Sequence, residues 1–154
     1  MQIFRLLLIA FLTIFLTGCN WFRPTAYFFI SNISKERKAV DIKVSIAAKK
    51  VLDDSIRYTG IQPDLSNTSN ISLPKGKYVK KVTADNGQAL AEQPIYLGND
   101  KWIFISYSYL PIDTAHANML INKLGDDTAS VNLRLGGHPP SVTIFIMDKE
   151  PVHM

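Results

Sequence analysis

One cysteine, Cys19, follows the longest apolar run near the start of the chain, and its position carries the clearest chemistry. Arg5 supplies a positive charge, residues 6–16 form the apolar run, and Thr17 and Gly18 place small side chains directly before the thiol. A charged start, an apolar core and a small-residue exit are typical of a secretory signal peptide. A membrane-spanning helix needs about 20 residues, so this run is short for one. We therefore expect export, with Cys19 at the predicted cleavage point.

Leu16, Thr17, Gly18 and Cys19 closely resemble the lipobox of bacterial lipoproteins. The resemblance implies that a dedicated signal peptidase recognises Leu16, Thr17 and Gly18 and cuts before Cys19. It also implies a diacylglyceryl group on the Cys19 sulfur and an acyl chain on the new amine, with no other cofactor. The alternatives are a free cysteine at the end of an uncleaved anchor, or an ordinary signal peptide with a chance cysteine.

The resemblance also implies a location and a set of partners. Two acyl chains hold a protein stably on a bilayer without spanning it, so the membrane itself is the first expected partner. Asn20 follows the cysteine, where aspartate tends to retain such proteins in the inner membrane. The expected location is thus the outer membrane, on its periplasmic face in preference to the cell surface, or the cell membrane in a source with one membrane. Lipoprotein processing and sorting machinery and an envelope protein complete the expected partners.

The chain divides by composition into residues 1–18 as signal peptide, residues 19–25 as lipidated cysteine and short tether, and residues 26–150 as one domain. Trp21 and Phe22 in the tether suit either the membrane interface or the edge of the domain. No second cysteine is present, so an exported domain must hold together by packing alone. The net charge of +4 falls short of a nucleic-acid-binding signature, and we expect no nucleic-acid partner.

Alternating apolar residues predict an all-β fold. Val40, Ile42, Val44 and Ile46 alternate with polar or small residues, which indicates a strand with one face in a core. We expect strands at 27–30, 40–47, 51–58, 77–84, 89–97, 101–110, 129–135 and 142–147, a loop at 60–70, and a breaker at 136–140. Asp85-Asn86-Gly87 tolerates positive φ and predicts a hairpin turn between the strands at 77–84 and 89–97. Residues 114–124 fit a helix or a strand equally. Seven or eight strands after an N-terminal signal helix favour an antiparallel Ig-like or transthyretin-like β-sandwich.

A second resemblance lies within this strand pattern. Residues 73–78, running on to Val82 and to Asn86-Gly87, look like the turn-and-strand pattern of transthyretin-like and PEGA-type extracellular modules. It implies a sandwich and assigns no activity.

Two groups of side chains are candidates for a binding surface. The first is a basic cluster, and the second is an aromatic group on one expected central strand. They consist of Lys75, Lys77, Lys80 and Lys81, and of Trp102, Phe104, Tyr107 and Tyr109. The lysines fit anionic headgroups or an envelope polymer, or a solvated face that protects strand edges. The aromatic residues fit sugar stacking or a partner surface, or simply the core.

Catalytic signatures are missing from the sequence. It contains no Gly-x-Ser-x-Gly elbow and no glycine-rich phosphate loop after a strand. His116, His138 and His153 have no metal-ligand spacing. Asp53-Asp54 and Asp126-Asp127 are adjacent acids, which point to opposite strand faces or lie solvated in turns. We therefore expect a protein that is not an enzyme and holds no metal.

Three hypotheses follow from these residues. The first is a non-catalytic lipid-anchored envelope protein with a structural, assembly or protein-interaction role. The second is a binding module for envelope glycan or lipid, which an exposed aromatic strip beside the lysine cluster would favour and a buried Trp102 and Phe104 would oppose. The third is a hydrolase, which would need Asp113 and His116 to converge with another polar group in a cleft.

Overall fold

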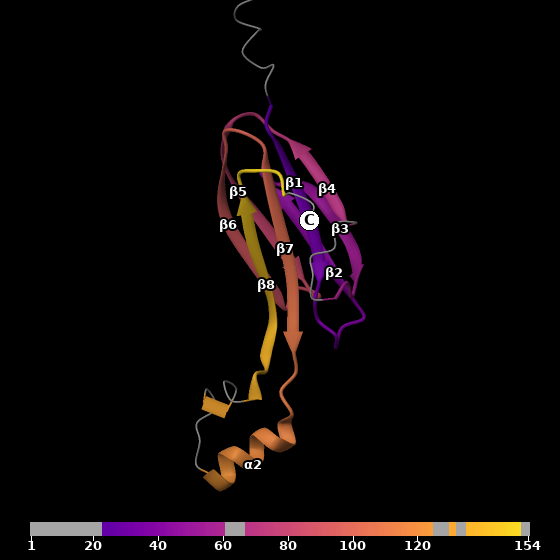
Figure 1. Cartoon of the computed structure of the whole chain (residues 1–154), viewed down its shortest axis with the longest axis vertical. Helices are drawn as coiled ribbons and strands as arrows, with labels where there is room; N and C mark the ends of the chain where they lie inside the picture. The colour runs from indigo at the N-terminus through magenta and orange to yellow at the C-terminus, as the bar shows by residue number, and fades with distance from the viewer. Residues whose placement is uncertain (1–22, 61–66, 125–129, 132–134, 152–154) are drawn as a thin grey trace, which may run out of the picture.

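The computed structural model describes residues 23–60, 67–124, 130–131 and 135–151, and these form a two-layer β-sandwich with one projecting helix (Figure 1). The predicted sandwich is confirmed. Its elements are β1 (Thr25–Asn32), β2 (Ala39–Ile46), β3 (Lys49–Arg57), β4 (Thr68–Ser72), β5 (Gly76–Ala84), β6 (Ala89–Leu97), β7 (Lys101–Leu110), α2 (Thr114–Leu124) and β8 (His138–Met147).

The strands form two sheets of four. One sheet has the order β4-β1-β7-β8 and the other has the order β3-β2-β5-β6; we name them sheet A and sheet B. β1 and β7 are parallel, whereas the remaining pairs are antiparallel. A parallel pair needs a long crossover, and here the connection from β1 to β7 includes β4 of sheet A and all four strands of sheet B. Sheet A is therefore mixed, whereas the sequence predicts an antiparallel sandwich.

The core lies between the sheets and is built from alternate residues. On β2, Val40, Ile42, Val44 and Ile46 are all buried, as their spacing predicts. On β1 and β7 the inward residues include Phe28, Ile30, Ile103 and Ile105. Because neighbouring residues on a strand point to opposite faces, the residues between them form the outer faces of the sandwich.

The β5–β6 hairpin has the turn that the sequence predicts. Asp85, Asn86 and Gly87 all have positive φ, at 53°, 53° and 86°. Aspartate, asparagine and glycine tolerate this region better than other residues, which is why they were expected here. Asp41 on β2 supports the turn, because its carboxylate accepts a hydrogen bond from the Asn86 backbone N–H at 3.1 Å.

Three expected segments differ from the structure. In the expected strand at 129–135, the described residues Ser130, Val131 and Leu135 are helical. β1 and β8 already flank β7, so a strand at 129–135 would have no central place in sheet A. The expected breaker at 136–140 is confirmed at Gly136 and Gly137, which form a turn before β8. His138, Pro139 and Pro140 instead open β8, since prolines are tolerated at a sheet edge. The expected loop at 60–70 gives way to β4 at Thr68, an edge strand beside β1.

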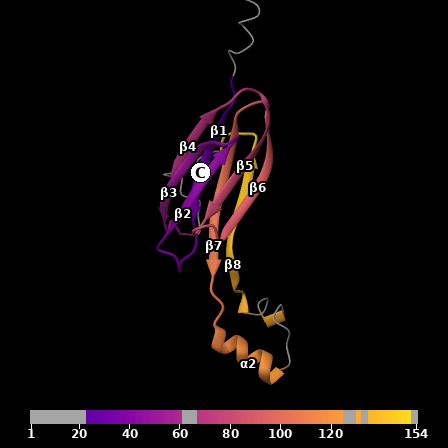
Figure 2. The same ribbon diagram turned by 180° about the vertical axis from the view of Figure 1, so that it is seen from behind.

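The helix α2 resolves the ambiguity at 114–124. Asp113 caps its first turn, with its carboxylate accepting backbone hydrogen bonds from Ala115 at 3.0 Å and His116 at 3.2 Å. The helix projects from one end of the sandwich, opposite the end at which β1 begins (Figures 1 and 2). Within the part of the chain that the structure describes, no helix is long and apolar enough to cross a membrane.

Candidate functional site

A ladder of aromatic side chains covers the outer face of sheet A. It consists of Tyr27, Phe29, Trp102, Phe104 and Phe145, and we call it the aromatic ladder. The strand register creates it, because Tyr27 lies opposite Trp102 and Phe104 lies between Phe29 and Phe145. The ladder sits on the solvent-facing side of β1, β7 and β8. Phe145 is the most exposed member at 60%.

The rings of the ladder stack on one another. The ring centroids of Tyr27 and Trp102 are 5.6 Å apart with planes 17° from parallel, and those of Phe29 and Phe104 are 4.9 Å apart at 16°. These distances match the spacing of adjacent strands, about 4.8 Å, so the rings stand upright on the sheet. Phe145 lies 6.4 Å from Phe104 at a tilt of 44°. The stacked pairs therefore present ring edges to the solvent and turn ring faces toward each other.

The structure divides the four aromatic residues that the sequence grouped together. Trp102 and Phe104 lie on the outer face, half-buried, rather than in the core. Tyr107 is 0% exposed and belongs to the core cluster. Tyr109 is half-buried at the far end of β7, where the Arg37 guanidinium lies 5.2 Å from its ring centroid. The residues that extend the ladder, Tyr27, Phe29 and Phe145, come from strands whose register the sequence did not reveal.

A polar cluster ties the two sheets together at the end nearest α2. The Tyr107 hydroxyl on β7 donates a hydrogen bond of 2.9 Å to the carboxylate of Asp85, which lies in the β5–β6 turn. Arg37, in the β1–β2 loop, forms an ion pair of 3.3 Å with the same carboxylate. Burial, together with the Asp85 carboxylate, raises the pKa of Tyr107 to about 12. This arrangement is structural, because the Asp85 carboxylate pairs with both the Tyr107 hydroxyl and the Arg37 guanidinium across the two sheets.

The predicted lysine cluster does not form one surface. Lys75, Lys77 and Lys81 are exposed, whereas Lys80 points inward and is 0% exposed. Lys77 and Lys81 lie on the outer face of sheet B, on the opposite side of the sandwich from the aromatic ladder. Lys81 pairs with Glu92 at 2.9 Å. The two candidate groups are therefore not side by side, as a combined glycan site would require.

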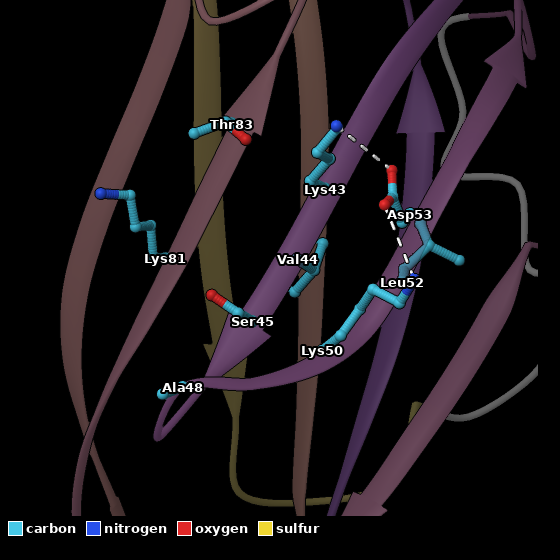
Figure 3. A pocket seen from close by; sticks show the side chains of 9 residues that line it. All are labelled: Lys43, Val44, Ser45, Ala48, Lys50, Leu52, Asp53, Lys81 and Thr83. Atoms are coloured by element: carbon cyan, nitrogen blue, oxygen red, sulfur yellow. Dashed lines mark ion pairs between the residues drawn. The ribbon is translucent and has the colours of Figure 1, made fainter.

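A shallow basic hollow lies on the outer face of sheet B (Figure 3). Its volume is about 250 Å³, and Lys43, Lys50, Lys81, Ser45 and Thr83 contribute polar groups to its lining. The Asp53 carboxylate binds two of these lysines, Lys43 at 3.7 Å and Lys50 at 3.6 Å (Figure 3). Exposed ion pairs of this kind contribute about 0–1 kcal/mol. The hollow is a solvated face with much of its charge already neutralised.

Lys80 is the residue whose environment the sequence analysis missed. The period of two was the available signal, because Lys80 is an even number of residues from Tyr78, Val82 and Ala84. All four therefore lie on the inner face of β5. No protein group among the described residues hydrogen bonds the Nζ of Lys80. The same holds for Oε1 of Gln93, which lies directly opposite Lys80 on β6. Burial lowers the pKa of Lys80 to about 8.

The remaining chemical candidates do not converge. The Asp113 carboxylate is used to cap α2, and His116 is exposed on that helix. His138 begins β8, where its Nδ1 lies 2.9 Å from the Pro139 carbonyl oxygen. Among the described residues, no group of three or more His, Cys, Asp or Glu side chains could hold a metal.

Several predicted residues lie outside the described ranges. They are Leu16, Thr17, Gly18 and Cys19 of the lipobox, Trp21 and Phe22 of the tether, Asp126 and Asp127, and His153.

Comparisons of the chain with protein-family models, with curated proteins and with solved structures gave no match.

The first prediction concerns Lys80→Met. Below pH 8 both the folded and the unfolded states carry the charged amine, and its burial costs about 3 kcal/mol. Between pH 8 and 10.5 the unfolded state binds more protons, so this cost is relieved and stability rises with pH. We expect the variant to be more stable at pH 7 by about 1–4 kcal/mol. Urea unfolding should show this advantage shrinking between pH 8 and 10; a constant or negative difference would contradict it.

The second prediction concerns Tyr107→Phe. Removing the hydroxyl should lower the free energy of unfolding by about 1–3 kcal/mol at pH 7, because Asp85 loses a buried donor. The pKa of Tyr107 is raised on folding, so its contribution is complete below pH 10 and is lost as the pH rises toward 12. Unfolding curves of the two proteins should therefore converge above pH 10. Parallel curves across that range would show that the hydroxyl does not carry the effect.

Proposed function

We propose that this chain is a lipid-anchored, non-catalytic binding protein of the bacterial cell envelope, which engages a protein partner through the aromatic ladder. The single observation that carries the proposal is the row of stacked rings on the solvent-facing side of sheet A. Aromatic residues are enriched at protein interfaces, and apolar patches that face water often mark interaction sites.

The ring geometry favours a protein over a glycan as the partner. A sugar stacks on an open ring face, but the pairs Tyr27–Trp102 and Phe29–Phe104 turn their faces toward each other. Upright ring edges instead offer a ridged apolar surface, which aliphatic and aromatic side chains of a partner can fill. The separation of the lysines from the ladder argues the same way, because no cationic group of that cluster borders it.

The membrane anchor in this proposal is Cys19, and its support is the lipobox resemblance of residues 16–19. The fold is compatible with it. β1 begins at Thr25, so few residues separate the folded domain from the cysteine. Residues extend by at most about 3.6 Å each, which keeps the domain within roughly 20 Å of the lipid headgroups. The proposed place is the periplasmic face of the outer membrane.

A substitution at the cysteine tests the anchor. Cys19→Ser removes the sulfur that would take the lipid, so we expect a full-length precursor with its leader still attached. Mass spectrometry of the intact protein from membranes should show this precursor, and the unsubstituted protein should show a diacylglyceryl group and an N-acyl chain. Normal cleavage of the variant and release of a soluble protein would disprove the lipoprotein assignment.

Site-specific crosslinking tests the aromatic ladder as a partner surface. A photoreactive p-benzoylphenylalanine at Phe145 should give a discrete protein adduct in cells. The matched control is the same residue at Tyr96 on the outer face of sheet B, since Phe145 is 60% exposed and Tyr96 is 59% exposed. Equal adducts at both positions, or no protein adduct at Phe145, would contradict the proposed role of the ladder.

A further inference from the structure

The two sheets leave a groove along one side of the sandwich. Among the described strands, β6 pairs only with β5 and β8 pairs only with β7, so each is an edge strand. The groove between them has a volume of about 330 Å³, and its lining consists of Ala91, Glu92, Gln93, Val142, Thr143 and Ile144. Edge strands present unpaired backbone N–H and C=O groups, to which another extended chain can pair.

An unpaired cation lies behind this groove. Lys80 is one strand inward from β6, and it faces the space between the sheets together with Gln93, its cross-strand neighbour. Lys80 is fully buried, and neither its Nζ nor the Gln93 Oε1 has a hydrogen-bond partner in the described part of the protein. Buried charges are normally paired, since an isolated one is costly. Among the residues that the structure describes, the inner face thus holds a positive charge without a counterion, beside a groove that Gln93 helps to line.

Two acidic side chains of sheet B are engaged on its outer face. Glu92 is also on β6, but it is exposed and forms an ion pair with Lys81. Asp53 on β3 binds Lys43 and Lys50 on the outer face of sheet B. The counterion that complements Lys80 must therefore come from outside these residues, and the groove beside Gln93 is the side from which it can enter.

We propose that the groove binds an extended segment of a partner protein, which adds as a strand beside β6 and inserts a glutamate side chain between the sheets to pair with Lys80. This site is separate from the aromatic ladder and does not depend on it. Main-chain hydrogen bonds to a sheet edge supply affinity in such complexes, and an inserted side chain supplies specificity.

Strand spacing determines which acid fits. An added strand would place its backbone two strand spacings from β5, about 10 Å from that of Lys80. The four-carbon stem of lysine and the two methylenes of glutamate can together span this distance, whereas aspartate is one methylene shorter. Pro94 leaves the β6 edge one N–H donor short, which favours a short segment. We therefore expect glutamate to be preferred over aspartate.

Synthetic peptides test the proposal directly. The probe is a nine-residue peptide of alternating threonine and valine with a central glutamate, and the comparison peptides carry glutamine or aspartate there. Binding to the purified protein in detergent is measured by fluorescence anisotropy at pH 7. We expect the glutamate peptide to bind at least tenfold more tightly than the glutamine peptide, with the aspartate peptide in between.

Variants connect this preference to Lys80. In Lys80→Met the ratio of glutamine-peptide Kd to glutamate-peptide Kd should fall to about one. Lys77→Met, an outward substitution on the same strand, should leave this ratio unchanged. No binding, equal binding of the two peptides, or a preference that persists in Lys80→Met would overturn the proposal. Binding of sodium decanoate without binding of the peptide would also overturn it, in favour of a free carboxylate ligand. Peptide binding and crosslinking at Phe145 are separate measurements, so either site can fail without the other.

Discussion

The fold depends on burying alternate side chains of the eight described strands between two sheets, because no cysteine pair is available to hold them. A one-residue shift in strand register would turn the buried set toward water, so this burial also specifies the register. On β2 the buried residues are all β-branched, which suits a pleated surface. The Tyr107–Asp85 hydrogen bond adds a directional interaction to the apolar packing, since it links β7 of sheet A to a turn of sheet B.

Lys80 is the exception to this pattern, because it places a charged side chain among the buried apolar residues. Its neighbours in phase, Val82 and Ala84, are buried apolar residues, and a methionine would fit the same pattern. A charged amine in that position opposes the constraint on which the sandwich rests. Proteins tolerate such local conflicts chiefly where function requires them, so the seam beside β6 is a place to search for function.

Much of the fold could be predicted from the sequence, because strand periodicity and turn chemistry are local. The alternation from Val40 to Ile46 predicted which face of β2 is buried, and Asp85-Asn86-Gly87 predicted the hairpin turn. The parallel pairing of β1 with β7 could not be predicted, since it joins residues about 75 positions apart through backbone contacts that leave no local pattern. The strand predicted at 129–135 was wrong for a related reason. Alternation is a local pattern, whereas a strand also needs a neighbouring strand with which to pair.

The candidate sites were predicted only in part. Trp102 and Phe104 were identified by residue type, but the ladder arises when β1 and β8 bring Phe29 and Phe145 alongside them. The four lysines were predicted to share one surface because they are close in sequence. The period of two along β5 instead places Lys80 on the inner face and Lys77 and Lys81 on the outer face. Residue type therefore predicts which contacts a side chain can make. Its position along the strand and the strand register determine the face on which it lies and the side chains beside it.

The start of β1 and the helix α2 lie at opposite ends of the long axis (Figure 1). β7 contains 10 residues, and at about 3.3 Å per residue it spans roughly 33 Å. A lipid at Cys19 would therefore stand the sandwich upright, with α2 pointing away from the bilayer and the outer face of sheet A turned sideways. Molecules tethered in the same leaflet would meet that face by lateral diffusion, so confinement to two dimensions would raise their effective concentration.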